Sequence, residues 1–326
     1  MINPEDHISK KEVQRLLGTA LPGQKILNII PIIRGSTNII FHVKTFNNNY
    51  ILKISHRDDR NKGKVLEKEA KILSEHQQQK NYTIPVPKLL WQGQTEKGWP
   101  AILISFLEGE RIEDLIKPGI NVKNAAKNLG RFLAQWHKNK HPEINEFETG
   151  RSSFPDFNTY ARHWLKEWEP LCLKATHIKQ KDIRIAYNFI YEHLHLFKEK
   201  RWPFIQGDIT NQNLLGKIKN GKLILTGLCD FENVQTGPME YDIATIHDGI
   251  FLFYPEMEKP FLEGYREISP TSKNFKKRLK AVNLFRALRY IKRSVKYNEI
   301  HYFNHDRKYF KSWLKKSKLD GGHGEI

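Results

Sequence analysis

The pattern of apolar residues changes type near residue 110, and this change limits the folds that the chain can adopt. Before it lie runs rich in β-branched and aromatic residues, which are typical of strands: KILNIIPII at 25–33, NIIFHVKTF at 38–46, NNYILKIS at 48–55 and WPAILISFL at 99–107. After it, apolar residues recur every three or four positions, from Val122 to Trp136 and again over 157–172 and 182–199. The sequence therefore predicts an α+β protein with a β-rich N-terminal lobe, residues 1–107, and a larger, mainly helical C-terminal lobe, residues 108–326.

The positive charge of the chain is concentrated near its C-terminal end. Lys and Arg number 54 against 36 Asp and Glu, a net charge of +18, and residues 271–320 hold 16 Lys or Arg against three acids, a surplus of 13. Leu284, Leu288 and Ile291 recur there at helical spacing, so solvated helix faces are the favoured interpretation. A surface that binds nucleic acid or anionic lipid stays open as the alternative.

The two cysteines, Cys172 and Cys229, exclude a disulfide framework and a zinc site built from cysteines. The first residues, MINPEDHISKKEVQ, are polar and acidic where a secretory signal would be basic and then apolar. No apolar run approaches the length of a membrane span. We therefore expect a cytoplasmic protein.

One helix of the N-terminal lobe, predicted at 61–80, carries a carboxylate on its apolar face. Glu69 shares that face with Leu66 and Leu73, whereas Glu67 points away from it. A carboxylate on an apolar face needs a cationic partner, and Lys53 in the preceding strand is the nearest candidate. The alternative is a glutamate at the helix margin and a lysine whose ammonium group reaches solvent.

The segment FIQGDITNQNLL, residues 204–215, combines an acid with asparagines and a glycine. Asn220-Gly221 further on is a strong signal for a hairpin turn, and the register of that hairpin predicts Asn213 opposite Leu228, which brings Asp230 close to Asn213. A carboxylate and an amide oxygen suit Mg²⁺ held jointly with phosphates, and Asp208 would be free to accept a proton. These residue types also favour turns for purely local reasons, so spacing alone leaves both interpretations open.

Several segments between about residue 30 and 250 can be compared with known families: RGSTNIIFHV, YILKIS, EKEAKIL, IPVPKLL, LGRFLAQWH, QGDITNQNLL and LCDFENVQTGPMEYDIATI. In matching order, they resemble the aminoglycoside phosphotransferase and choline kinase superfamily. The resemblance implies a protein-kinase-like bilobal fold and a kinase that uses ATP and Mg²⁺ to phosphorylate a hydroxyl of a small molecule. A phosphate-covering segment with only one glycine disfavours a protein kinase, and no P-loop pattern occurs.

The resemblance also implies roles for residues at the matching positions. Asp208 resembles the catalytic base, Asn213 and Asp230 resemble the Mg²⁺ ligands, and Lys53 resembles the lysine that contacts the nucleotide phosphates, with Glu69 as its partner on the helix. Asp242 matches the acid that supports the catalytic loop.

The remaining matches concern the nucleotide. Ser105, Phe106 and Leu107 resemble the hinge whose backbone meets adenine, and Gly35 with Ser36 resembles the turn that covers the phosphates. The sequence departs from the family at Gln206, where histidine is usual. Glutamine can donate and accept hydrogen bonds but carries no charge, so a pH-sensitive role at this position is excluded.

Two functions follow as hypotheses. The first is an ATP- and Mg²⁺-dependent phosphotransferase whose acceptor is an aminoglycoside-, choline- or sugar-like alcohol. The second is a catalytically weak kinase-like protein that binds nucleic acid or an anionic surface through its basic C-terminal helices. The sequence leaves the acceptor and the oligomeric state open.

Overall fold

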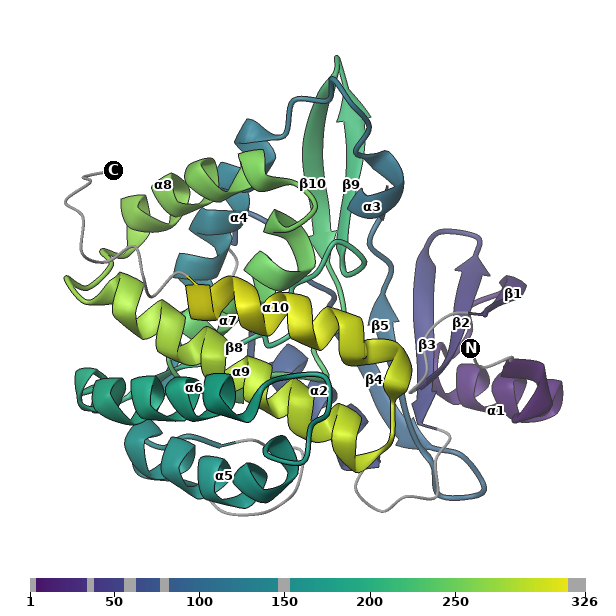
Figure 1. The fold of residues 1–326 in the computed structure, drawn as a ribbon. Coiled ribbons are helices and arrows are strands. Elements are labelled where there is room, and N and C mark those ends of the chain that lie inside the picture. The colour runs from purple at the N-terminus through teal and green to yellow at the C-terminus, as the bar shows by residue number, and fades with distance from the viewer. Residues whose placement is uncertain (1–3, 34–37, 56–62, 77–81, 146–152, 316–326) are drawn as a thin grey trace.

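The computed structural model describes residues 4–33, 38–55, 63–76, 82–145 and 153–315. It contains a β-rich N-terminal part and a mainly helical C-terminal part, seen to the right and left of Figure 1, as the sequence predicts. The elements up to residue 105 are η1 (Pro4–Asp6), α1 (Lys10–Ala20), β1 (Ile26–Ile32), β2 (Asn38–Thr45), β3 (Asn49–Ser55), α2 (Gly63–His76), β4 (Leu89–Gln94) and β5 (Pro100–Ser105).

The strands of the N-terminal part form one antiparallel sheet in the order β1-β2-β3-β5-β4. Residues alternate between its two faces: Ile39, Phe41 and Val43 share a core with α1, whereas Ile102 and Ile104 belong to the core that includes α2. The four predicted strand regions are confirmed, and β4 is a further strand that is not among the predicted ones.

The C-terminal part begins with two short elements, β6 and α3, and ends in helices. Its elements are β6 (Glu110–Arg111), α3 (Ile112–Leu115), α4 (Lys123–Trp136), β7 (Lys140–His141), α5 (Phe157–Cys172), α6 (Gln180–His193), η2 (Leu194–Leu196), β8 (Trp202–Ile205), β9 (Leu214–Lys219), β10 (Lys222–Leu228), β11 (Gln235–Thr236), α7 (Glu240–Ile246), η3 (His247–Phe251, a π-helix), η4 (Pro255–Met257), α8 (Glu258–Ile268), α9 (Phe275–Lys296), η5 (Ile300–Tyr302) and α10 (Phe303–Lys315).

The hairpin β9–β10 turns at Asn220-Gly221, where both residues have positive φ, 52° and 70°. Near the turn the pairing follows the predicted register, with Lys222 opposite Lys219. An irregularity between Leu225 and Gly227 then shifts the register by one, so Leu228 pairs with Leu214 and the predicted pairing with Asn213 is wrong. Asn213 still lies beside the strand end, because its carbonyl accepts a hydrogen bond from the Cys229 N–H at 2.9 Å.

The basic C-terminal helices turn part of their charge inward. Arg278, Lys280 and Arg286 of α9 are all buried, at 3–6% exposure. Arg278 pairs with Glu240 and Glu199, and Lys280 lies over the Phe189 ring. Part of the positive surplus therefore stabilises the packing of α9 and is not available to a surface partner. No helix among the described residues is both long and apolar enough to cross a membrane.

Candidate active site

A buried lysine joins the N-terminal sheet to α2 and to the segment after β10. Lys53 of β3 has its Nζ 2.9 Å from both Oε1 and Oε2 of Glu69, and 3.3 Å from Oδ1 of Asp230. Glu69 is fully buried, and its Oε1 also accepts a hydrogen bond from the Phe231 N–H at 3.3 Å. The structure thus brings together three predicted site residues and pairs Lys53 with Glu69, while Glu67 is exposed.

The charges in this cluster act on each other strongly because water is excluded. Burial by itself lowers the pKa of the Lys53 ammonium, but the nearby charges of Asp230, Glu69 and Glu232 raise it above its usual range. Burial raises the pKa of Glu69, an effect that the Lys53 charge opposes. Lys53 therefore remains a cation, and its position between acids from two parts of the chain depends on these contacts.

The loop between β8 and β9 holds Asp208 and Asn213 in contact. The Asn213 amide Nδ2 donates to the Asp208 backbone carbonyl at 2.9 Å and to the Asp208 carboxylate Oδ2 at 3.0 Å. Burial and the charge of Asp230 raise the pKa of Asp208 to about 6, against the hydrogen bond from Asn213 and the charge of Arg286, which lower it. The amide of Asn233 donates to the same oxygen at 3.5 Å, so two side chains hold the carboxylate. Its pKa lies in the range useful to a general base.

Gln206 links the two acids through its side-chain amide. Its Oε1 accepts a hydrogen bond from the Asp208 N–H at 2.7 Å, and its Nε2 donates to the Asp230 carbonyl at 2.6 Å. A histidine offers the same pair of groups, one ring nitrogen that accepts and one that donates, which explains how glutamine can occupy the position. Next to it, Gly207 has φ +84°, and a Cβ there would lie 2.5 Å from the Asn233 carbonyl oxygen, so the loop requires glycine.

Asp242 of α7 holds the start of this loop through two backbone hydrogen bonds. Its Oδ2 accepts from the Gln206 N–H at 2.8 Å and its Oδ1 from the Gly207 N–H at 2.7 Å. His137, directly after α4, places Nε2 3.1 Å from Asp242 Oδ2 and Nδ1 2.9 Å from the Tyr265 hydroxyl. His137 is not among the predicted site residues, although it ends the segment LGRFLAQWH. Its position directly after a helix with an apolar, buried face is the signal in the sequence.

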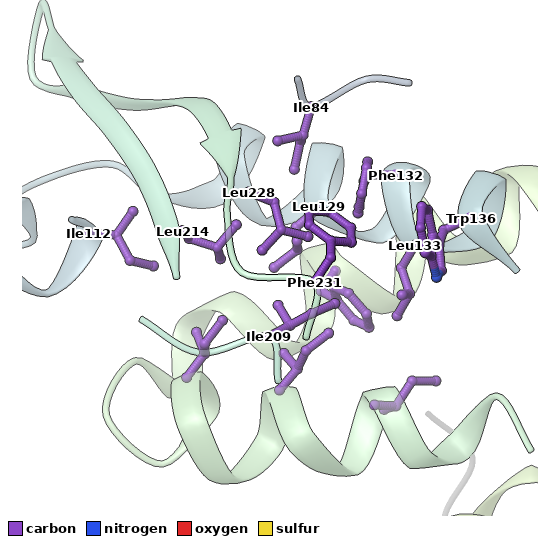
Figure 2. Close-up of a cluster of buried hydrophobic side chains, with 14 of the residues drawn as sticks. Ile84, Ile112, Leu129, Phe132, Leu133, Trp136, Ile209, Leu214, Leu228 and Phe231 are labelled. Carbon is purple, nitrogen blue, oxygen red and sulfur yellow. The ribbon is translucent and has the colours of Figure 1, made fainter. Parts of the chain in front are cut away.

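The apolar core beneath the site anchors both segments that carry acids. Figure 2 shows Ile209, Leu214, Leu228 and Phe231 gathered against side chains of α4, among them Leu129, Leu133 and Trp136, and all belong to one buried cluster. Phe231 and Trp136 have ring centroids 5.4 Å apart.

Asp230, between Leu228 and Phe231, has a positive φ of 67°, which is rare for a residue other than glycine. Because Leu228 and Phe231 are anchored in the core, they hold the strained backbone that turns the Asp230 carboxylate toward Lys53.

The predicted hinge begins at Ser105, the last residue of β5. The Ser105 N–H donates to the Lys88 carbonyl at 2.9 Å, and the Phe106 ring stacks on His42 at 4.5 Å. In the described part of the chain the Leu107 N–H has no hydrogen-bond acceptor, which leaves a donor free at this edge. Gly35 and Ser36, predicted to cover the phosphates, lie outside the described residues.

Glu232 is a further acid of the site, which the sequence analysis did not assign a role. Its Oε2 accepts from Asn38 Nδ2 of β2 at 3.0 Å, so it ties the segment after β10 to the N-terminal sheet. Burial and the charges of Asp230 and Glu69 raise its pKa to about 8. In the sequence, the position of Glu232 two residues after the predicted metal ligand Asp230 indicates that it lies near the site.

The donor set fits a metal ion only if phosphates and water complete it. Asn213 Oδ1 and Asp230 Oδ2 accept no hydrogen bond from any described residue, so both oxygens are available. Within the described ranges, no three His, Cys, Asp or Glu side chains converge on one metal position. Two protein oxygens are compatible with Mg²⁺, which usually keeps several waters and binds through one or two side chains plus substrate phosphates.

Solved structures similar to this chain include two aminoglycoside phosphotransferases and a putative fructosamine-3-kinase. Aminoglycoside phosphotransferase APH(4)-Ia aligns over 97% of this chain and 100% of its own, with a TM-score of 0.69 and 13% identity. The GDP complex of aminoglycoside 2′-phosphotransferase-IIIa aligns over 95% and 100%, with a TM-score of 0.65 and 12% identity. A putative fructosamine-3-kinase from Haemophilus somnus 129PT aligns over 93% and 97%, with a TM-score of 0.61 and 16% identity. At these identities the likeness establishes the fold, and the prediction of a kinase-like bilobal fold is confirmed.

The sequence itself gives the family. No curated protein matches the chain. The model of the phosphotransferase enzyme family matches residues 28–272, three quarters of the chain, and this range includes every predicted site residue. The chain therefore belongs to the phosphotransferase enzyme family.

Proposed function

We propose that the protein transfers the γ-phosphate of ATP to a hydroxyl group of a small molecule, with Mg²⁺ as cofactor. The observation that carries the proposal is the meeting of two groups from different parts of the chain: the ion cluster of Lys53, Glu69 and Asp230, and the hydrogen-bonded pair of Asp208 and Asn213. Phosphoryl transfer needs this combination of a cation at the phosphates, oxygen ligands for a metal and a base for the acceptor.

Each residue would act at a stated atom. Lys53 Nζ would contact phosphate oxygens of the nucleotide while Glu69 holds the ammonium in place. Asp208, with Oδ2 fixed by Asn213, would orient the acceptor hydroxyl and take its proton. The free N–H of Leu107 would meet the nucleobase. Asn213 Oδ1 and Asp230 Oδ2 would hold Mg²⁺, which when bound neutralises charge on the phosphates.

Two observations on relatives support nucleotide use and a small acceptor. A structure of APH(4)-Ia, with 14% identity and a TM-score of 0.66, is a ternary complex with AMP-PNP and hygromycin B. The 2′-phosphotransferase-IIIa structure holds GDP. ATP and GTP should therefore both be tested as donors.

The test is a phosphotransfer assay with purified protein, Mg-ATP or Mg-GTP and a panel of alcohol acceptors. Asp208→Asn keeps the size of the side chain and is expected to lower kcat at least about 100-fold, the smallest usual contribution of a general base. Asp182→Asn, at a partly exposed position in the first turn of α6, makes the same chemical change as a control. EDTA in place of Mg²⁺ should abolish turnover. Equal turnover by wild type and Asp208→Asn with every acceptor would contradict the proposal.

A further inference from the structure

A polar cavity lies in the C-terminal part, between η3, the end of α9, η5 and the start of α10. Its volume is about 140 Å³, and its lining is Asp248, Tyr290, Arg293, Ser294, Glu299, Tyr302, His305 and Asp306. Asp248 is followed by Gly249, whose carbonyl accepts a hydrogen bond from the Asn211 N–H at 3.4 Å. The wall of the cavity is thus joined directly to the loop that carries Asp208.

A chain of hydrogen bonds crosses one wall of this cavity. Arg286 Nη2 donates to the Tyr290 hydroxyl at 2.6 Å, and that hydroxyl donates to Asp248 Oδ2 at 3.3 Å. His305 Nε2 lies 3.3 Å from the other oxygen, Asp248 Oδ1. Tyr290 and Asp248 therefore present fixed polar groups whose orientation does not depend on a ligand.

Arg286 behind this wall has an unusual environment for a cation. It is 5% exposed, and no carboxylate of the described residues lies within salt-bridge distance of it. Its partners are the Tyr290 and Thr245 hydroxyls and the faces of the Tyr241 and Tyr290 rings, and its Nε has no partner within the described ranges. Burial of such a charge is costly unless surrounding polar groups and aromatic rings compensate for the lost water, and here the charge polarises the hydroxyl of Tyr290.

The charges that line the cavity nearly cancel. Asp248, Glu299 and Asp306 face two cations, Arg293 and His305. Arg293 Nε lies 3.1 Å from Glu299, and His305 lies 3.3 Å from Asp248 and 3.6 Å from Asp306. The hydrogen bonds with Asp248 and Asp306 raise the pKa of His305 to about 9, so it is charged at neutral pH. One net negative charge remains among these five side chains, and Arg286 behind the wall offsets it. The cavity therefore has no surplus of acids to neutralise several ammonium groups.

On the basis of the proposed function, we infer that this cavity recognises the acceptor and selects a polyhydroxy compound with at most one positive charge. Hydroxyl groups both donate and accept, and the lining offers carboxylate acceptors beside Arg293, His305 and hydroxyl donors. Tyr302, 43% exposed, adds an aromatic face. The volume is below the roughly 300 Å³ of pockets for drug-sized ligands, so the cavity takes one sugar-sized ring of the acceptor.

The test is calorimetric binding to the full chain, with and without AMP-PNP, so that it does not depend on turnover. The probes are glucose, ribose and fructose as neutral compounds, glucosamine with one charge, and hygromycin B as an aminoglycoside. We expect a neutral or singly charged sugar to bind with the higher affinity and with little dependence on salt, because screening acts on charged ligands.

Two variants tie the binding to the cavity. Tyr290→Phe keeps the ring and removes the hydroxyl, and it should raise the dissociation constant at least about tenfold, since a hydrogen bond in contact with a charged group is lost. Asp248→Asn keeps the shape and is expected to act in the same direction. Tyr297→Phe makes the same change on an exposed tyrosine outside the lining and should leave binding within about twofold.

Three outcomes would overturn the inference: tighter, salt-sensitive binding of hygromycin B, equal binding by the Tyr290→Phe and Tyr297→Phe variants, or no sugar binding although AMP-PNP binds. Failure of the proposed function gives a different result: the wild type would not bind AMP-PNP. The sugar titrations without nucleotide would then still measure binding to the cavity.

Discussion

Replacing Lys53 by methionine should cost more stability than replacing Glu69 by glutamine, although the two residues form one ion pair. Without Lys53, Glu69 stays fully buried with only the Phe231 N–H as donor, and Asp230 loses the same cation. Without the Glu69 charge, Lys53 still has Asp230 at 3.3 Å, and the glutamine oxygen can still accept from Lys53 and from Phe231. The two substitutions differ in their effect on stability because Lys53 is the cation that contacts both Glu69 and Asp230.

The magnitudes follow from the burial of the pair. Removal of one partner from a buried ion pair usually costs about 3–5 kcal/mol, and we expect this for Lys53→Met, because Glu69 is inaccessible to water. For Glu69→Gln we expect about 1–2 kcal/mol, close to the loss of one hydrogen bond. In the double variant no charge is left unpaired in the core, so adding Lys53→Met to Glu69→Gln should cost less than about 2 kcal/mol. The coupling energy is then at least about 1 kcal/mol, a size usual for residues in contact.

The assay is urea unfolding of the four proteins, followed by tryptophan fluorescence, since Trp136 is buried against Phe231. Glu67→Gln, on the exposed face of the same helix, is the control and should change the free energy of unfolding by less than about 0.5 kcal/mol. If Lys53→Met and Glu69→Gln cost the same and their effects add, the cluster does not share its lysine as described.

Two further predictions test the packing and the charge of the C-terminal part. Gly130 on α4 lies so close to α8 that a Cβ would be 2.0 Å from the Phe261 carbonyl oxygen, so Gly130→Ala should lower the free energy of unfolding by at least about 3 kcal/mol. Gly18→Ala in α1, with open space around it, is the control and should raise the free energy of unfolding by up to about 1 kcal/mol. Similar effects of both substitutions would refute the close contact. The pKa of His305 is raised from 6.5 to about 9 by hydrogen bonds with Asp248 and Asp306, so its contribution to stability is complete below pH 6.5 and is lost as the pH rises through 9. Urea unfolding at both pH values should therefore show a larger loss in the wild type than in His305→Gln, and equal losses would contradict the assignment.

Much of the fold follows from local pattern. The β-branched and aromatic runs of β2 and β3 and the helical periodicity of α4 are properties of neighbouring residues. The sequence therefore predicts these elements and the point where strands give way to helices. Helical phase alone also distinguishes Glu69 from Glu67, because residues three and four positions apart share a face. The structure pairs Lys53 with the residue that this phase indicates.

The contacts that shape the site depend on parts of the chain far from each other. The turn at Asn220-Gly221 determines the pairing next to it, but it does not determine the irregularity near Gly227, which shifts the register farther along the hairpin. The support of Asp242 by His137 joins residues 105 positions apart, and the Asn38–Glu232 contact spans 194. Local sequence does not report such distances, because they are set by how α4, α7 and the sheet pack.

The sequence by itself determined the two-part architecture and the family, since both rest on the order and spacing of short segments. Only the tertiary structure decided how Gln206 substitutes for a histidine, by a side-chain amide that meets a donor at Asp208 and an acceptor at Asp230. It also decided that part of the basic C-terminal charge is internal. Periodicity places Arg278 and Arg286 on a helix, but their burial depends on what packs against that helix, and the acids and aromatic rings that receive them come from α7 and from the segment after α6.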